Sequence, residues 1–410
     1  MNPDLQHRRE LSRAARLLET VDHPSHRLVD GLRQWSRQDP EGRRARLHRI
    51  GPCLALQAST LPTEDQAELD PGALQSWRRR LRAAAAQHMH LEAALEQISE
   101  QLGDDLPWAP IKGMDLAYRV YRRPEERPTS DLDILIHGAD LERARTRLTR
   151  AGWRPLHTGR RAEAYLQDEG YAWQARNAEG ALLELHHRLW AWIHPDAAGT
   201  WLGRARPPED SDQHGPEAQG LRLQPADAYL VAAVHLWLDA APRPLIAFRD
   251  LERLATTAQD PARLAQDIAA AARDFDLQLP VVAAARVVRM LWKDDVAEML
   301  VRELDTDLSP AERRVLPREL PESASLSRFV LARHLSRRTA RHGLAHALRR
   351  RVWAHPGIVE VGSPDAWPWW ARRLAYQTAA AGSRRLYPIF DKLFARSDPD
   401  PPPARPGDPP

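Results

Sequence analysis

The chain has 410 residues, of which 43% are hydrophobic and 28% are charged. This composition is typical of a globular protein of two or three domains, and a formal net charge of only +3 argues against a general polyanion binder. The single cysteine, Cys53, excludes an intrachain disulfide and a cysteine-based zinc site.

The sequence contains no signal for the membrane or for export. Its N-terminus, "MNPDLQHRRELSRAARLLET", lacks the apolar core of a signal peptide. No apolar stretch reaches the length that spans a bilayer. We therefore expect a cytoplasmic protein without a transmembrane segment.

Residues 1–95 predict an N-terminal helical region. Leucine and alanine recur at three- and four-residue spacing in "HRLVDGLRQW" and in "LQSWRRRLRAAAAQHMHLEAALEQISEQL". Proline and glycine are concentrated between these periodic runs, which is where helices are expected to end.

Residues 96–200 predict a compact α/β core. In chain order, "WAPI" is a short strand, "MDLAYRVY" a helix, "RRPEERPTS" a polar loop and "DLDILIHG" a second strand. An amphipathic helix in "GADLERARTRLTRAGW" follows. Two further strands joined by a turn at residues 177–180 complete the core, and the second of them is "ALLELHHRLW".

The remainder of the chain predicts a linker, a helical region and a tail. Residues 201–220 are rich in proline, glycine and acids and predict a loop or linker, and residues 221–396 predict a C-terminal helical region. Residues 397–410 predict a disordered, proline-rich tail. The fold class is therefore α+β, a small mixed-sheet core flanked by helical regions. The arginine-rich segment 328–351 predicts either a solvated helix face or a contact for RNA or a membrane surface.

Two aspartates stand at the start of the second core strand. Asp131 and Asp133 are two residues apart, so on a strand their side chains point to one face, roughly 6.6 Å apart along the backbone. Carboxylates held side by side repel each other unless a cation lies between them, and oxygen ligands of this kind suit Mg²⁺. An aspartate pair in a solvated loop is the alternative interpretation.

The last core strand offers a second polar pair. Glu184 and His186 share one face of "LLELHHRLW", and His187 lies on the other. Glu184 would serve as a third carboxylate or take the proton from an attacking hydroxyl, and His186 would do either less well or orient the acids. The histidine spacing does not match a zinc protease helix.

Lys112 and Gly113 fall at the predicted turn from the first strand to the helix. Only three of the 59 basic residues are lysines, which makes this one conspicuous. Glycine lets a phosphate approach the backbone, and a helix N-terminus presents free N–H groups to it. A lysine there would add a compact positive charge. A surface lysine beside an ordinary glycine turn is the alternative.

These motifs together resemble a known family. The segment "IKGMDLAYRVYRRPEERPTSDLDILI...DLERARTRLTRAGW" is similar to the bacterial family called uncharacterised nucleotidyltransferase, within the DNA polymerase β-like nucleotidyltransferase superfamily. "LLELHHRLW", "QPADAYLVAAVHLWL" and "RPLIAFRDLERL" resemble later parts of that family, with His235 and Asp250 at matching positions. The Lys-Gly and Asp-x-Asp pattern is also distantly similar to the AbiEii-type nucleotidyltransferase toxins.

The resemblance implies a set of site residues. Asp131, Asp133 and Glu184 would be the catalytic and Mg²⁺-binding carboxylates, and the substrate would contact the residues Lys112, Gly113, Arg127, Ser130 and His186. The implied reaction is attack by an acceptor hydroxyl on a nucleoside triphosphate (NTP), which transfers a nucleoside monophosphate and releases pyrophosphate.

The sequence leaves the acceptor and the catalytic competence open. A small molecule or a peptide-derived metabolite is the first choice of acceptor, because the net charge is near neutral, and a tRNA end is the next. The alternative from another class is a nucleotide-binding or regulatory module with weak catalysis. That alternative gains if Glu184 does not face Asp131 and Asp133, whereas a tRNA acceptor predicts binding that weakens steeply with salt.

Overall fold

The structure is a computed structural model, and it describes residues 12, 14–15, 17–18, 26–156, 158, 172–189, 197–208, 220–238 and 244–316. The chain divides into two compact units, residues 1–156 with 171–336 and residues 157–170 with 337–410. All the elements below belong to the first unit. The predicted arginine-rich segment 328–351 and the tail 397–410 lie outside the described residues.

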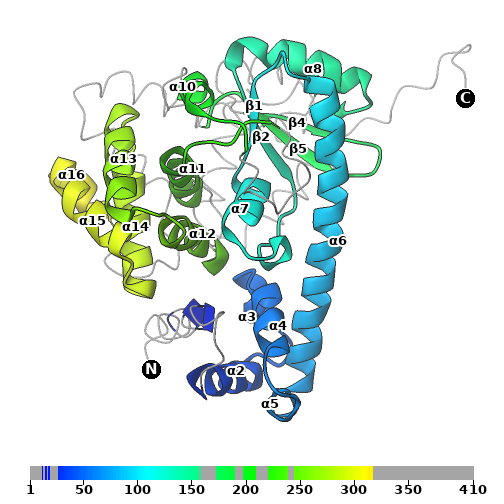
Figure 1. Ribbon diagram of the computed structural model, residues 1–410, viewed down its shortest axis with the longest axis vertical. Helices are drawn as coiled ribbons and strands as arrows, with labels where there is room; N and C mark the ends of the chain where they lie inside the picture. The colour runs from blue at the N-terminus through cyan, green and yellow to red at the C-terminus, as the bar shows by residue number, and fades with distance from the viewer. Residues whose placement is uncertain are drawn as a thin grey trace, which may run out of the picture. The chain divides into compact units, whose positions relative to one another are not determined.

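The N-terminal region is helical, as predicted. Its helices are α2 (His26–Gln38), α3 (Arg43–Leu47), α4 (Gly51–Ser59), α5 (Thr63–Ala67) and α6 (Pro71–Leu102). Helix α6 begins where the Asp70 side chain accepts a hydrogen bond from the backbone N–H of Ala73. It ends at Gly103, which has a positive φ of 63°. Helix α6 runs from α4 and α5 to the sheet and α8 (Figure 1), so it crosses the predicted boundary at residue 95 without a break.

The α/β core contains a five-stranded mixed sheet of order β1-β2-β5-β4-β3. The strands are β1 (Trp108–Ile111), β2 (Leu132–Ile136), β3 (Arg154–Pro155), β4 (Ala172–Arg176) and β5 (Leu182–His186). Strands β2 and β5 are parallel, and the other neighbouring pairs are antiparallel. Every residue of β2 is buried, which explains why its sequence is a nearly continuous apolar run. The predicted turn at residues 177–180 joins β4 to β5.

Short helices connect these strands. They are α7 (Lys112–Val120), η1 (Pro124–Glu126), η2 (Gly138–Asp140) and α8 (Leu141–Arg150). Helix α7 begins at Lys112, two residues before the predicted start, and directly continues β1. The fold class is thus α+β, as predicted from the sequence.

The C-terminal region is a bundle of helices up to the last described residue. They are α10 (Ala197–Arg204), α11 (Pro225–Leu238), α12 (Leu245–Thr256), α13 (Pro261–Asp274), α14 (Gln278–Trp292), α15 (Asp295–Leu304), η3 (Asp305–Asp307) and α16 (Pro310–Val315). The first residues of the predicted loop at 201–220 belong to α10. The helix continues there because the fully buried Trp201 packs edge-on against Phe275, at 5.0 Å between ring centroids.

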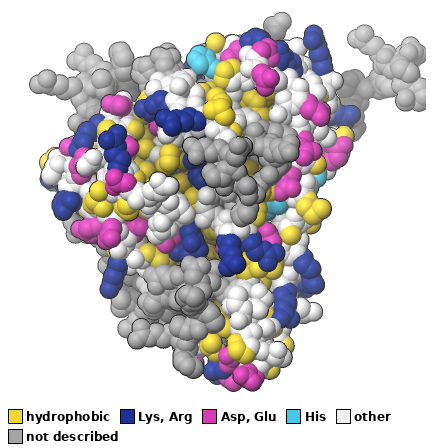
Figure 2. Space-filling model, viewed as in Figure 1, with side chains coloured by type: hydrophobic (Ala, Val, Ile, Leu, Met, Phe, Trp, Pro, Cys, Tyr) yellow, Lys and Arg dark blue, Asp and Glu magenta, His cyan; other side chains and the backbone are white. Residues whose placement is uncertain are grey.

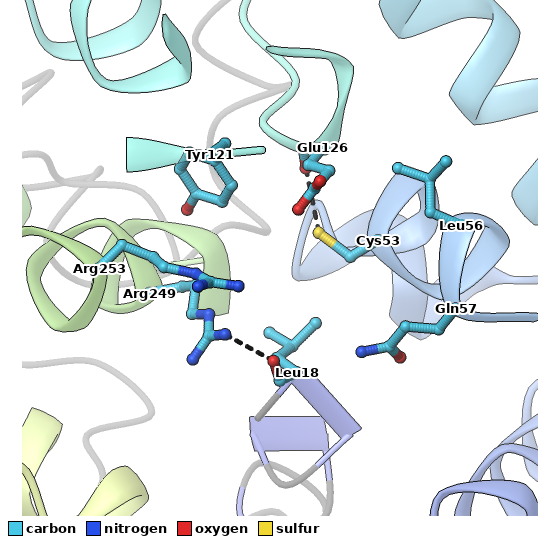
Figure 3. Close-up of a pocket in the computed structure, with 8 residues that line it drawn as sticks. All are labelled: Leu18, Cys53, Leu56, Gln57, Tyr121, Glu126, Arg249 and Arg253. Carbon is cyan, nitrogen blue, oxygen red and sulfur yellow. Dashed lines mark hydrogen bonds between the residues drawn. The ribbon is translucent and has the colours of Figure 1, made fainter. Parts of the chain in front are cut away.

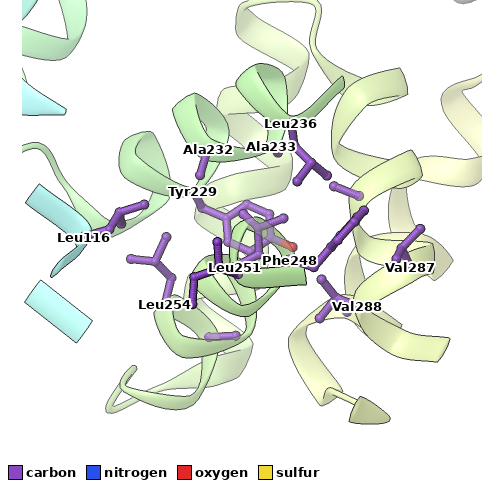
Figure 4. Packing of buried hydrophobic residues seen from close by; sticks show 14 of the residues in the cluster. Leu116, Tyr229, Ala232, Ala233, Leu236, Phe248, Leu251, Leu254, Val287 and Val288 are labelled. Carbon is purple, nitrogen blue, oxygen red and sulfur yellow. The ribbon is translucent and has the colours of Figure 1, made fainter. Parts of the chain in front are cut away.

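One hydrophobic cluster connects this bundle to the α/β core. Leu116 of α7 lies beside Tyr229 of α11 and Leu254 of α12 (Figure 4). Burial of each such side chain stabilises the folded state by roughly 1.5–3 kcal/mol. The helix that starts at Lys112 is therefore fixed on one side by the sheet and on the other by α11 and α12. Among the described helices, none has the length and apolar character to cross a membrane.

Candidate active site

The parallel pair β2–β5 brings three functional side chains together. Asp133 and Glu184 are register partners on neighbouring strands, and His186 follows Glu184 by two residues. Side chains two residues apart on a strand share a face, so all three point to the same side of the sheet. One ligand atom from each of the three lies within 4.8 Å of the other two.

Lys112 reaches into this group from the first residue of α7. Its Nζ donates a hydrogen bond of 2.8 Å to Asp133 Oδ1 and lies 3.3 Å from His186 Nε2. His186 Nε2 is itself 2.8 Å from the same Asp133 oxygen. Burial alone would raise the pKa of Asp133, but the Lys112 ammonium and the His186 hydrogen bond hold this pKa well below its usual range. Asp133 is thus ionised at neutral pH.

The backbone at Lys112 is strained. Its φ is 54°, in the left-handed region that residues with a Cβ rarely adopt. Such a conformation costs on the order of 1–3 kcal/mol and persists only where the surroundings impose it. Here the end of β1, the start of α7 and the ion pair with Asp133 fix the residue. The side chain is only 9% exposed, so Lys112 is a buried ion-pair partner rather than a surface lysine.

Asp131 directly precedes β2. It lies beside the cluster that Lys112, Asp133, Glu184 and His186 form, but it makes no hydrogen bond to these four side chains. Its Oδ1 is 3.3 Å from the Ser130 hydroxyl. Burial and then the negative charges of Asp133 and Glu184 raise the pKa of Asp131 to about 6. The predicted aspartate pair is therefore present, but the two side chains differ in protonation behaviour.

Glu184 is the register partner of Asp133 on the neighbouring strand. Gln174, its register partner on β4, donates a hydrogen bond of 2.6 Å to Oε1, and Oε2 lies 3.4 Å from His186 Nε2. Burial would raise the pKa of Glu184, but the interaction with His186 lowers it overall. The carboxylate is thereby oriented from both sides.

Gly113 lies against the loop before β2, at a position with no room for a side chain. A Cβ at this position would collide with Thr129 Oγ1 and would lie 3.3 Å from Arg127 Nη1. The loop that leads to Asp131 thus rests on the first turn of α7. The glycine leaves room for these two side chains against the first turn of α7.

Arg127 is paired with Asp250 of α12. Its Nε donates to Asp250 Oδ1 at 2.9 Å, and its Nη2 donates to Oδ2 at 2.8 Å. The resemblance to the family implied Arg127 as a substrate contact and placed Asp250 at a matching position. The structure pairs Asp250 with Arg127 and with the Tyr121 hydroxyl, which donates to Oδ1 at 2.8 Å.

His235, near the end of α11, is a residue that sequence reasoning did not assign to the site. Burial, and next the positive charge of Lys112, lower its pKa to about 3, while Asp133 opposes the shift. Its Nδ1 is buried and has no hydrogen-bond partner among the described residues. A histidine in an apolar helix is usually a core residue, so its sequence context carried no signal for the site.

The oxygen atoms of this site suit a divalent cation. Asp133, Glu184 and His186 form the close set of possible ligands, and Lys112 and His186 both contact Asp133. Asp131 borders this set, near enough for the charges of Asp133 and Glu184 to affect its pKa. Burial is the main cause of the raised pKa of Asp131, and the negative charges of Asp133 and Glu184 add to it. Oxygen-rich sites of this kind favour hard cations such as Mg²⁺.

Residues 42–293 match the family described as uncharacterised nucleotidyltransferase. The chain belongs to this family. The match covers the N-terminal helices α3–α6, the whole sheet and the helices up to α14. A search of curated proteins finds no match. The protein is therefore a nucleotidyltransferase, and enzymes of this kind use NTP substrates and generally divalent metals. The likeness to AbiEii-type toxins stays a prediction.

Proposed function

We propose that this nucleotidyltransferase transfers a nucleoside monophosphate from an NTP to an acceptor hydroxyl with the help of Mg²⁺. The observation that supports this most directly is the register pairing of Asp133 with Glu184, with Asp131 beside them. Asp133 and Glu184 share one face of two parallel strands, and Asp131 directly precedes the first of these strands.

Asp131, Asp133 and Glu184 would hold the cation. When bound there, a divalent cation would supply Lewis-acid stabilisation of the negative charge that develops at the α-phosphate. Glu184 would act as the third ligand or accept the proton of the acceptor hydroxyl. His186, through its contacts with both Asp133 and Glu184, would keep the two carboxylates in place.

The start of α7 would bind the phosphates. Gly113 places a backbone N–H in the first turn of the helix, where no intrahelical partner is available. Lys112 neutralises Asp133 and adds positive charge near the leaving pyrophosphate. Ser130, exposed beside Asp131, would contact the substrate at the open side. The acceptor oxygen would bond to the α-phosphorus, the bond to the β-phosphate oxygen would break, and pyrophosphate would leave.

A small molecule or a peptide-derived metabolite is the proposed acceptor. The net charge is +3, and both positive and negative side chains lie on the face shown in Figure 2. A surface that binds tRNA would need a continuous positive area. Steep weakening of acceptor binding with salt would instead indicate a nucleic acid.

Calorimetric titration with each of the four NTPs tests the proposal. With Mg²⁺ present, we expect micromolar binding of at least one NTP, and about 100-fold weaker binding by the Asp131→Asn/Asp133→Asn variant, which loses the cation ligands. Asp227→Asn, which changes a buried aspartate of α11, is the matched control and should bind normally. If the folded wild-type protein binds no NTP, the proposed function is wrong.

A further inference from the structure

The guanidinium group of Arg127 has two sides with different surroundings. Nε and Nη2 are occupied by the carboxylate of Asp250. Nη1 makes no hydrogen bond within the described part of the chain, and it does not belong to the fully buried polar atoms that lack partners. The Arg127 side chain as a whole is only 12% exposed. Its Nη1 lies beside Gly113, at 3.3 Å from the position of an added Cβ.

Asp250 is firmly held on α12. Phe248, Leu251 and Leu254 of the same helix are embedded in the hydrophobic cluster (Figure 4). The Asp250 residue is only 2% exposed, and the Tyr121 hydroxyl supplies a further hydrogen bond to Oδ1. A carboxylate with this many donors has little freedom to move.

The neighbours of Arg127 and Asp250 are also fixed. Cys53 Sγ donates to the backbone oxygen of Glu126 at 3.1 Å, and Arg249 donates to the backbone oxygen of Leu18 at 2.6 Å (Figure 3). These contacts surround a small cavity on whose wall Tyr121 also lies. The carbonyl oxygen of Arg127 lies 3.0 Å from Nε2 of a histidine on α6, His88.

We propose that Asp250 is a positioning residue for the triphosphate site. It binds no nucleotide, but it holds the Arg127 side chain so that Nη1 points to the phosphate-binding turn at Gly113. The inference rests on the proposed function. A free arginine side chain would have to lose rotational freedom on binding, whereas one clamped by Asp250 has already lost it. The helical region thereby completes a site whose carboxylates all come from the α/β core.

The test measures NTP affinity by calorimetry at pH 7.5 with Mg²⁺, using the NTP that the wild-type protein binds. Arg127→Met removes the phosphate contact, and Asp250→Asn weakens the clamp. We expect each to weaken binding by about 10-fold or more, as loss of a charge-assisted hydrogen bond does. The Asp250→Asn/Arg127→Met variant should bind no more weakly than Arg127→Met alone, because Asp250 acts only through Arg127.

A purely structural role predicts different results. Asp227→Asn is the control, since Asp227 is also a buried partner of an arginine, Arg204, at 2.6 Å. Its affinity should stay within about 2-fold of the wild type. Wild-type affinity in folded Asp250→Asn, or a loss that adds to that of Arg127→Met, would overturn the inference while leaving the proposed function intact.

A gentler variant covers the case in which Asp250→Asn does not fold. Tyr121→Phe removes one hydrogen bond to Asp250 and leaves the ion pair. We expect about 3-fold weaker binding that disappears when Arg127→Met is also present. Unchanged affinity in folded Tyr121→Phe, or a loss that adds to that of Arg127→Met, would overturn the inference. A wild-type protein that binds no NTP would instead overturn the proposed function and, with it, this inference.

Discussion

Lys112 forms a buried ion pair, which a lysine that only binds phosphate would not need. It neutralises Asp133 inside the protein, at 2.8 Å, and both side chains are under 10% exposed. Lys112→Met would leave the Asp133 carboxylate buried without its direct counter-charge. Breaking a buried pair in this way costs about 3–5 kcal/mol. We expect a loss of about 3 kcal/mol in the free energy of unfolding by urea, since His186 still contacts Asp133.

The Lys112→Met/Asp133→Asn variant provides the control for this prediction. With the buried charge also removed, much of the lost stability should return, because the cost comes from the unpaired ion rather than from a missing contact. A loss below about 1 kcal/mol in Lys112→Met would show that water already compensates the Asp133 charge. The sequence marked Lys112 as unusual, but its partner lies 21 residues away, and only the sheet pairing of β1 with β2 brings the two together.

The start of α7 is the element on which the site depends most. Gly113→Ala would push a methyl group into Thr129 Oγ1 and against Arg127 Nη1, so the loop before β2 would have to move. Overpacking of this kind typically costs about 1–3 kcal/mol of stability. We expect that loss in urea unfolding, together with weaker NTP binding. Gly113→Ala/Thr129→Ala should recover part of both. Equal stability of Gly113→Ala and the wild type would contradict the predicted packing.

The elements themselves were largely predictable, and their ends were not. The apolar runs of β1 and β2 and the alternation in β4 and β5 indicated the strands, and the turn at 177–180 had the expected residues. The start of α7 at Lys112 depends on a positive φ that sequence does not reveal. The composition at 201–220 predicted a loop, but α10 continues to Arg204 because burial of Trp201 outweighs local preference.

The residues of the site also differ in how far the sequence could predict them. Asp131, Asp133, Glu184 and Lys112 could be proposed from the sequence because each belongs to a motif on a short stretch of chain. The clamp of Asp250 on Arg127 spans 123 residues and was not found. It depends on how α12 packs against α7, which no local pattern contains.

Across the whole molecule, buried groups shift their pKa values in opposite directions. Burial raises the pKa of Asp227 on α11 and that of Asp294, the N-cap of α15, to about 6 from 3.8. The folded state therefore binds protons that the unfolded state releases, and this stabilisation is lost as pH rises through about 6. Burial lowers the pKa of His235 to about 3 from 6.5, so its contribution is present above pH 6.5 and is lost on acidification.

These opposing contributions predict a result for the Asp227→Asn/Asp294→Asn variant. Between pH 8 and pH 5, protonation of each aspartate in the folded wild type adds about 1.4 kcal/mol to the free energy of unfolding. The variant lacks both gains, whereas the His235 loss remains. Relative to the wild type, its free energy of unfolding by urea should therefore fall by about 3 kcal/mol between pH 8 and pH 5. The two sites are on different helices, so each single variant should show about half of this change. Parallel pH curves for wild type and variant would mean that both carboxyl groups titrate as they do in the unfolded chain.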